Sequence, residues 1–329
     1  MTHPGKARTA LKRGALVTAA NWQVVIIQAV AETAFKLLLA VPILGGAFLV
    51  TLLLGRDISE VLAGDLREIL FGVAATLTEH PLALAAYLAG FLFVLAGGAS
   101  LVFLVKGGTV SLLADADREA GPIERPPLRM AAFRQAMRFS IDRFTAGAGR
   151  LLRRYLKLGV LLAALYMLAA GLVLLLGYGL YRAAGSPPLL LGSVVAVSVT
   201  VFIALITVVN VLYLLVQVVV AVSDSGVGRA IREVARFLRG EFWKLTRVFG
   251  VTLLLLLAAT LLSIAATWGF YLIAYVPLAG LIVLPLQLAA WLLRSLVFQY
   301  LGLTALAAYL HLYRSFSHDP SGMAAPASR

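Results

Sequence analysis

Residues 227–250 read VGRAIREVARFLRGEFWKLTRVFG, and an apolar run without a charged residue follows directly. In a helix, apolar side chains at steps of three and four share one face, here Val227, Ile231, Val234, Ala235, Leu238, Phe242 and Leu245. The basic side chains lie mostly on the other side: Arg229, Arg232, Arg236, Arg239 and Lys244. Such a helix is typical of a membrane surface, with its arginines toward anionic headgroups. We therefore predict that Val227–Pro277 is a basic amphipathic helix leading into a membrane hairpin.

The composition indicates an integral membrane protein. Of the 329 residues, 61% are hydrophobic and 13% charged, whereas soluble domains are nearer half apolar and a quarter charged. The net charge of +13 would suggest a nucleic-acid partner in a soluble protein. Here the basic residues cluster between apolar runs, which is typical of topogenic charge and lipid contact, so we expect no nucleic-acid binding. The chain has no cysteine, which excludes disulfides, zinc–thiolate sites and thiol catalysis within it.

Six apolar runs predict an all-α protein of about six transmembrane helices. Their ranges are Leu37–Leu54, Leu82–Val105, Leu158–Tyr181, Leu189–Val222, Val248–Tyr275 and Leu281–Tyr313. The first run begins at Gln23 and is too long for one span or for the core of a cleavable signal peptide. It is either a long helix that kinks near Pro42 or an interfacial helix followed by the span. The connection Arg56–Pro81 is predicted to be an amphipathic helix with an acidic balance.

Charge asymmetry predicts the orientation. The segments before the first, third and fifth spans are basic, and the connection inside each hairpin is acidic, nearly neutral or uncharged. The positive-inside rule then places both termini and the basic connections in the cytoplasm, and we expect the chain to lie in a bacterial inner (plasma) membrane. We expect three hairpins, each preceded by a basic amphipathic cytoplasmic helix. Residues 1–316 would form one polytopic domain and residues 317–329 a disordered tail.

A threefold internal repeat is one interpretation of this pattern. Three segments each begin with alanine, an apolar residue and a basic residue. They are ALKRGALVTAANWQVV from Ala10, AMRFSIDRFTAGAGRLL from Ala136 and AIREVARFLRGEFWKL from Ala230. The repeat units would cover residues 1–120, 121–224 and 225–316 and share one orientation in the membrane. The alternative is that any basic helix before a membrane span looks alike.

The basic helix with arginine and phenylalanine, followed by a span, resembles the YciC-like and DUF4013-like bacterial membrane domains. These include the membrane region that accompanies some glycerophosphodiester phosphodiesterases. The close of the last span, AYLHLYR from Ala308 to Arg314, is similar to the tyrosine-rich close of those domains. That close often carries an aspartate between the tyrosine and the arginine, and this chain has none between Tyr309 and Arg314. The resemblance implies a polytopic helical fold and no particular activity, and the phosphodiesterase catalytic domain has no counterpart here.

Arg294 is the first candidate site residue, because it lies in the apolar stretch LAAWLLRSLVFQYLG without an acidic neighbour. A charge inside a membrane favours a functional hypothesis, such as contact with an anionic substrate or a lipid phosphate. The alternative is that the last run is two segments and Arg294 reaches the membrane surface.

Four further polar residues lie in apolar runs. Glu32 and Lys36 would form either an intramembrane pair or a solvated pair on an interfacial helix. Asn210 and Gln217 would either line a cavity together with Arg294 or join helices by hydrogen bonds.

The remaining polar residues form no pattern typical of a catalytic or metal site. The four histidines have no metal-ligand spacing, and no hydroxyl residue has a nearby acid–base partner, so we predict no catalytic residue, metal or cofactor. The leading hypothesis is a non-catalytic, membrane-organising or partner-binding protein that contacts anionic lipid. The headgroup candidates are Arg134, Arg138, Arg229, Arg232, Arg236 and Arg239. The alternative is a transporter or lipid-handling protein with an intramembrane cavity around Arg294, and a third possibility is a subunit bound to membrane or cytoplasmic protein partners.

Overall fold

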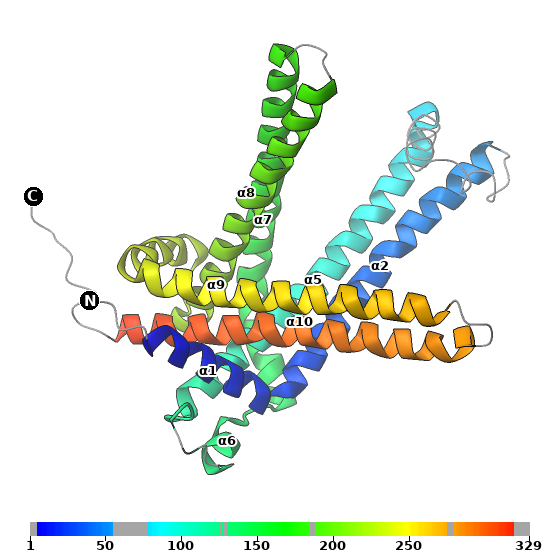
Figure 1. Cartoon of the computed structure of the whole chain (residues 1–329). Coiled ribbons are helices and arrows are strands. Elements are labelled where there is room, and N and C mark those ends of the chain that lie inside the picture. Colours follow the sequence, from blue (N-terminus) through cyan, green and yellow to red (C-terminus); the bar gives the residue numbers. More distant parts are fainter. Residues whose placement is uncertain are drawn as a thin grey trace, which may run out of the picture. The chain divides into compact units, whose positions relative to one another are not determined.

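The computed structural model describes residues 5–54, 78–125, 127, 130–184, 188–274 and 279–318. Within these ranges the chain is helical and contains no strand, which confirms the all-α prediction (Figure 1). The helices are α1 (Gly5–Ala20), α2 (Trp22–Leu54), α5 (Pro81–Glu119), α6 (Met130–Ala136), α7 (Ile141–Ala184), α8 (Pro188–Ser223), α9 (Val227–Ala274) and α10 (Ala279–Ser317).

Six of the described helices are long and apolar enough to cross a membrane: α2, α5, α7, α8, α9 and α10. The chain is thus an all-helical, multi-pass membrane protein by length and composition. The longest, α7 and α9, have 44 and 48 residues. At about 1.5 Å per residue each exceeds a roughly 30 Å hydrocarbon core about twofold. Part of each helix must therefore lie outside the hydrocarbon.

The chain divides into two compact units, one of Met1–Ile26 with Lys106–Arg329 and the other of Ile27–Val105. In the smaller unit, α2 and α5 approach closely at glycines. A side chain added at Gly98 would overlap the Phe35 ring, and one added at Gly46 would overlap the Tyr87 ring. The first apolar run is one helix with Pro42 inside it. The predicted acidic helix lies almost wholly outside the described residues, as do residues 319–329 of the predicted tail.

The core of the larger unit lies at the ends of the long helices, outside most of their apolar length. Its largest fully buried side chains come from α1, α5, α7, α8, α9 and α10 and include Val17, Leu112, Tyr155, Leu215, Phe237 and Leu310. In contrast, only 11% of the most apolar window of α7, α8 or α9 is buried within the protein. These apolar stretches have little protein around them, which is the environment expected of helices in contact with lipid.

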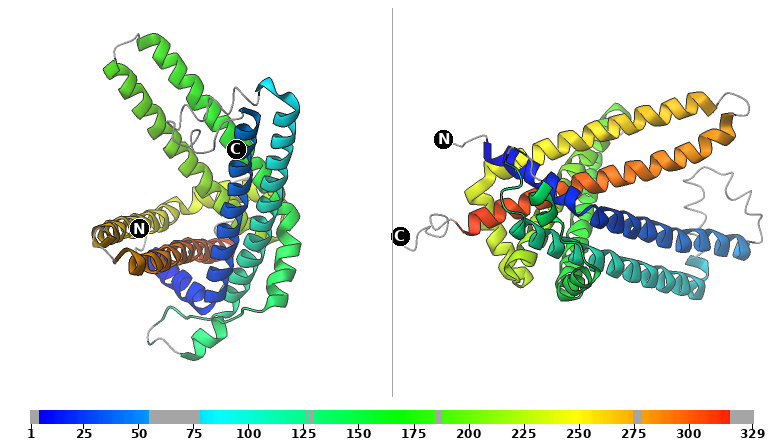
Figure 2. Two further views of the ribbon diagram at one scale, coloured as in Figure 1. Left: turned by 90° about the vertical axis from the view of Figure 1, so that its right-hand side faces the viewer. Right: turned by 90° about the horizontal axis from the view of Figure 1, so that it is seen from below.

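Consecutive helices of the larger unit lie side by side. α7 packs along α8, and α9 packs along α10 (Figure 2). α1 packs against the C-terminal part of α10, where Tyr300 donates a hydrogen bond from its hydroxyl to the Ala15 carbonyl at 3.1 Å.

Two helix breaks separate polar segments from apolar ones. α9 kinks at Glu241, where φ is −125° and ψ is 24°, so its basic first part and its apolar remainder have different axes. α1 and α2 are separated at Asn21, whose side chain is fully buried. The Asn21 amide donates to the Ala136 carbonyl at 2.8 Å, and its oxygen accepts from the Arg138 backbone N–H at 2.9 Å. This residue therefore ties the first break to α6.

Replacing Gly14 with alanine is expected to destabilise the contact between α1 and α10. A Cβ at Gly14 would lie 2.5 Å from the Thr304 carbonyl oxygen and 2.8 Å from the Ala308 nitrogen. Both atoms are backbone, so the helices must separate, and overpacking of this kind costs about 1–3 kcal/mol. The matched control is Gly302→Ala on α10, where a Cβ meets nothing within 4 Å. Unfolding in detergent, followed by circular dichroism, should show a loss for Gly14→Ala alone. Equal stability of the two variants would contradict the close contact.

Candidate functional site

A buried cluster of charges joins α1, α5 and α10. Asp117 of α5 accepts from the Arg13 Nε of α1 at 2.6 Å and from the Arg314 Nη1 of α10 at 3.1 Å. Arg13 also donates to Glu124 Oε2 at 2.8 Å and to the backbone carbonyls of Asp117 and Gly121 at 2.7 and 2.5 Å. The two arginines are thus held by the two carboxylate oxygens of one aspartate, and Arg13 is bonded through all three of its side-chain nitrogens.

The cluster is well shielded from solvent. The exposed fractions of the Arg13 and Asp117 side chains are 8% and 4%, and that of Arg314 is 12%. Burial alone would lower the pKa of the Arg13 guanidinium, but the charges and hydrogen bonds of Asp117 and Glu124 outweigh it and raise that pKa. Arg13 is therefore held in its charged form. Because each charge has a partner, this cluster is a structural clamp between three helices.

Sequence reasoning missed this cluster. Arg13 and Asp117 are 104 positions apart, and Asp117 and Arg314 are 197 apart, so no local pattern links them. The available signal was the run ADADRE at residues 114–119, which is acidic in a connection that is otherwise basic. Arg314, near the end of α10, forms its ion pair with Asp117 of α5.

The basic part of α9 presents a row of arginines on its exposed side. Arg229, Arg232, Arg236 and Arg239 are all exposed, and none forms an ion pair within the described part of the chain. Three of them and Glu233 line a shallow hollow. The Glu233 carboxylate accepts a hydrogen bond from the Tyr313 hydroxyl at 2.7 Å. The one acid in this hollow is therefore engaged by α10, and the arginines remain open to a ligand.

The buried face of this segment differs from the predicted apolar face. Ala230, Val234 and Phe237 are buried, and the Phe237 ring packs against Tyr313 and Phe316 of α10 at centroid distances of 5.4 and 5.3 Å. Ile231 and Phe242, which belong to the predicted apolar face, are 42% and 50% exposed, and Ala235 of that face is exposed too. The apolar positions thus divide between a strip packed on α10 and an exposed strip beside the arginines.

The two headgroup candidates near α6 have different surroundings. Arg134 is exposed at the end of α6. Arg138 is half-buried and forms an ion pair with Glu119 at the end of α5, so its charge is already partly neutralised inside the protein.

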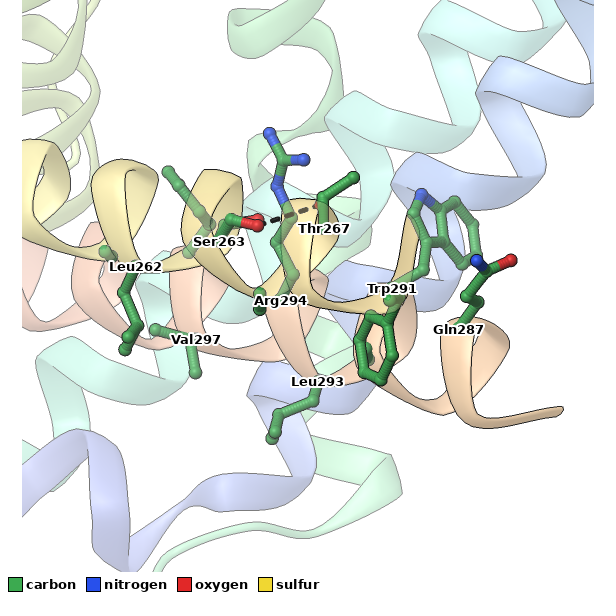
Figure 3. Close-up of a pocket in the computed structure, with 13 residues that line it drawn as sticks. Leu262, Ser263, Thr267, Gln287, Trp291, Leu293, Arg294 and Val297 are labelled. Atoms are coloured by element: carbon green, nitrogen blue, oxygen red, sulfur yellow. Dashed lines mark hydrogen bonds between the residues drawn. The ribbon is translucent and has the colours of Figure 1, made fainter. Parts of the chain in front are cut away.

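Arg294 lies at a cavity of about 480 Å³ between α9 and α10. The lining is mainly apolar and includes the small residues Ala259, Ala266 and Ala290, with Ser263, Thr267, Gln287 and Trp291 as its other polar members. In Figure 3 the Arg294 side chain extends toward the turn that holds Ser263 and Thr267, and Leu293 and Val297 belong to the lining of the same cavity. The guanidinium carbon lies 5.7 Å from the centre of the Phe298 ring.

The other polar candidates do not join Arg294. Every residue that lines its cavity comes from α9 or α10. On α8, Asn210 is exposed and accepts from the Tyr166 hydroxyl of α7 at 2.6 Å. Gln217 is buried, and its backbone carbonyl accepts from the Tyr155 hydroxyl of α7 at 3.1 Å. Both residues therefore join α7 to α8.

Glu32 and Lys36 lie on α2 in the smaller unit. Glu32 is half-buried and Lys36 is exposed, and no ion pair joins them among the described residues. The described residues also include no group of three or more acidic or histidine side chains that could hold a metal ion.

No protein-family model, curated protein or solved structure matches this chain. The resemblance to the YciC-like and DUF4013-like membrane domains therefore stays a prediction.

Proposed function

We propose that this protein is a non-catalytic component of a bacterial inner membrane that binds anionic lipid headgroups through the basic face of α9. In this arrangement both termini and the core of the larger unit are cytoplasmic, and the apolar helices cross the bilayer as three hairpins. The charge asymmetry of the chain supports this orientation. The position of the core at the helix ends supports it too, because the exposed apolar stretches need a hydrocarbon environment.

The threefold repeat is part of this proposal. Ala10, Ala136 and Ala230, which begin the three aligned segments, are all fully buried. The helix breaks at Asn21 and Glu241 come at the same distance from the alanines of the first and third segments. In the second segment the break comes earlier, because α6 ends at its alanine. These shared positions favour a repeated unit over a coincidence of basic composition.

The exposed face of α9 is the observation that carries the lipid-binding function. It combines four arginines that form no ion pair with any described residue and an exposed apolar strip at Ile231 and Ala235. Trp243 follows directly after the kink and is 64% exposed. A helix in the plane of a membrane needs this combination, because the arginines meet phosphates and the apolar and aromatic side chains enter the headgroup boundary.

The alternative function, a transporter with a cavity shared by Arg294, Asn210 and Gln217, has less support than lipid binding. It required Arg294, Asn210 and Gln217 to share one interior space, and the last two instead bind residues of α7. The other version of this alternative, a lipid-handling protein, requires only the cavity around Arg294, which the structure contains. The same arginine face could also bind an acidic protein partner. The lipid-association experiment below distinguishes lipid binding from protein binding.

Replacing Arg229, Arg232, Arg236 and Arg239 together with glutamine is expected to remove most of the protein's preference for anionic lipid. Each basic side chain near an anionic surface contributes about 1 kcal/mol, so the relative association of spin-labelled phosphatidylglycerol over phosphatidylcholine should fall about fivefold or more. Electron paramagnetic resonance of reconstituted protein measures this ratio. The matched control replaces the same four residues with lysine, which keeps the charge and should keep the preference. An unchanged ratio in the glutamine variant would contradict lipid binding by this face.

A further inference from the structure

We propose that the cavity between α9 and α10 is a binding site for one anionic phospholipid, with the headgroup phosphate at Arg294 and an acyl chain along the apolar lining. This site is separate from the basic face of α9. The inference rests on α9 and α10 crossing the membrane and does not depend on headgroup binding by the four arginines of that face.

The cavity results from small residues at the contact between the two helices. Ala259 and Ala266 of α9 and Ala290 of α10 leave a space that Leu262, Phe270 and Phe298 border. Its volume, about 480 Å³, lies within the range of about 300–1,000 Å³ for small-molecule sites, and a mostly apolar lining with few polar groups is typical of such sites. The space therefore suits hydrocarbon better than a soluble, fully polar ligand.

Arg294 lies within the membrane-spanning part of α10. From Ala279, where α10 begins, to Arg294 is about 22 Å along the axis at 1.5 Å per residue. From Arg294 to Leu303, where the buried end of α10 begins, is about 14 Å by the same measure. The long arginine side chain is thus in the half of the span nearer the cytoplasmic core of the protein. It can reach the phosphate level of that leaflet while its stem stays among apolar groups.

Among the residues that the structure describes, the charge of Arg294 has no anionic partner. None of the residues that line the cavity is acidic, and no ion pair to Arg294 occurs in the described ranges. A cation in the membrane interior is unfavourable by about 2.5–3.5 kcal/mol, and its contact with the Phe298 ring offsets only part of this, typically about 0.5–2 kcal/mol. An anion supplied by the lipid completes the site.

The other polar groups of the cavity fit a lipid headgroup. Trp291 lies one turn from Arg294 and carries an N–H donor that can bind a phosphate or glycerol oxygen. Thr267 donates its hydroxyl to the Ser263 carbonyl at 2.9 Å, so its oxygen remains only as an acceptor for headgroup hydroxyls. One donor therefore lies close to the cation, and the apolar residues continue the site along the helices toward Gln287, about two turns from Arg294.

Trp291 lines the cavity and provides a direct readout of the bound lipid. The chain has four tryptophans, so replacing Trp22, Trp243 and Trp268 with phenylalanine leaves Trp291 as the only emitter. The full chain is reconstituted in phosphatidylcholine vesicles containing a small fraction of phosphatidylglycerol with brominated acyl chains. Vesicles with brominated phosphatidylcholine at the same fraction are the reference. We expect brominated phosphatidylglycerol to reach half-maximal quenching of Trp291 at a fraction at least about fivefold lower, because it alone carries a net negative charge.

Three variants test the assignment of the two parts of the lipid. Arg294→Gln should remove the preference for phosphatidylglycerol, and Ala266→Leu should reduce quenching by both lipids because leucine fills the cavity. Ala265→Leu, at an exposed position that does not line the cavity, is the matched control and should behave as the parent protein. Thermal unfolding of each variant in detergent identifies those that fold normally, and only these are compared.

Several outcomes would overturn the proposal. They are equal quenching by the two brominated lipids, an unchanged preference in Arg294→Gln, or equal effects of the Ala266→Leu and Ala265→Leu variants. Soluble glycerol phosphate should not relieve the quenching, and relief would show that the site takes a free anion. Replacing Arg229, Arg232, Arg236 and Arg239 with glutamine should leave the quenching of Trp291 unchanged. Loss of the Trp291 signal and loss of surface lipid preference are therefore separate results.

Discussion

Asp117→Asn is expected to lower the free energy of unfolding by about 3–5 kcal/mol, the usual effect of removing one partner from a buried ion pair. Asparagine keeps the shape of the side chain and removes its charge, so the guanidinium groups of Arg13 and Arg314 would both lose their shared anion. Both arginines are largely buried, and Glu124 touches only the first of them. Because the cluster joins α1, α5 and α10, its loss should loosen all three helices in the larger unit.

The exposed ion pair between Arg154 and Asp224 is the matched control. Its side chains are 31% and 53% exposed, so Asp224→Asn should cost about 0–1 kcal/mol. Chemical unfolding in detergent, monitored by circular dichroism, gives both values under one condition. If Asp117→Asn were no more destabilising than Asp224→Asn, the buried cluster would not be a clamp.

Phe237→Ala is expected to be similarly destabilising, by about 3–5 kcal/mol. Phe237 is fully buried and packs against two aromatic rings of α10, Tyr313 and Phe316. Alanine would leave a cavity at the point where the basic part of α9 is held on α10. We therefore expect a second effect besides lower stability, a weaker preference for phosphatidylglycerol, because the arginine face would lose its fixed orientation.

Phe242→Ala removes the same number of atoms at a site that is 50% exposed, close to the same segment. It should cost about half as much or less, because Phe242 is already half exposed and its ring contact is with the exposed Trp243. Thermal unfolding of the two variants in the same detergent makes the comparison. Equal losses would contradict the packing of the basic segment on α10 through Phe237.

The membrane helices could be predicted from the sequence because long apolar runs and charge asymmetry are local properties. The pairing of Arg13, Asp117 and Arg314 could not, since it depends on three helices that meet only in the fold. The same limit applies to the end of the chain. There Arg314 pairs with a carboxylate from α5, which no inspection of the segment itself would find.

The periodicity of α9 predicted one apolar face, and the protein buries only part of it. A single helix with one apolar face would bury Ile231 and Phe242, but the kink at Glu241 separates Phe242 from the first part of the helix. The partner helix then selects Phe237 and Val234 for burial and leaves Ile231 exposed. Arg294 was found from the sequence because a charge in an apolar run is conspicuous. A cavity around Arg294 was predicted only as part of the alternative function and with other lining residues, because the lining depends on alanines of α9 that lie beside α10.

Lipid binding by the α9 face can be measured at one position, Ala235, which is exposed beside Arg232, Arg236 and Arg239. The chain has no cysteine, so Ala235→Cys carries a single bimane fluorophore in the full protein. The protein is reconstituted in vesicles with a nitroxide on the headgroup region of either phosphatidylglycerol or phosphatidylcholine, at equal fractions. We predict at least about twofold stronger quenching by labelled phosphatidylglycerol, and a loss of that difference at high salt. Equal quenching by the two labelled lipids at low salt would contradict the proposed binding of anionic headgroups by this helix.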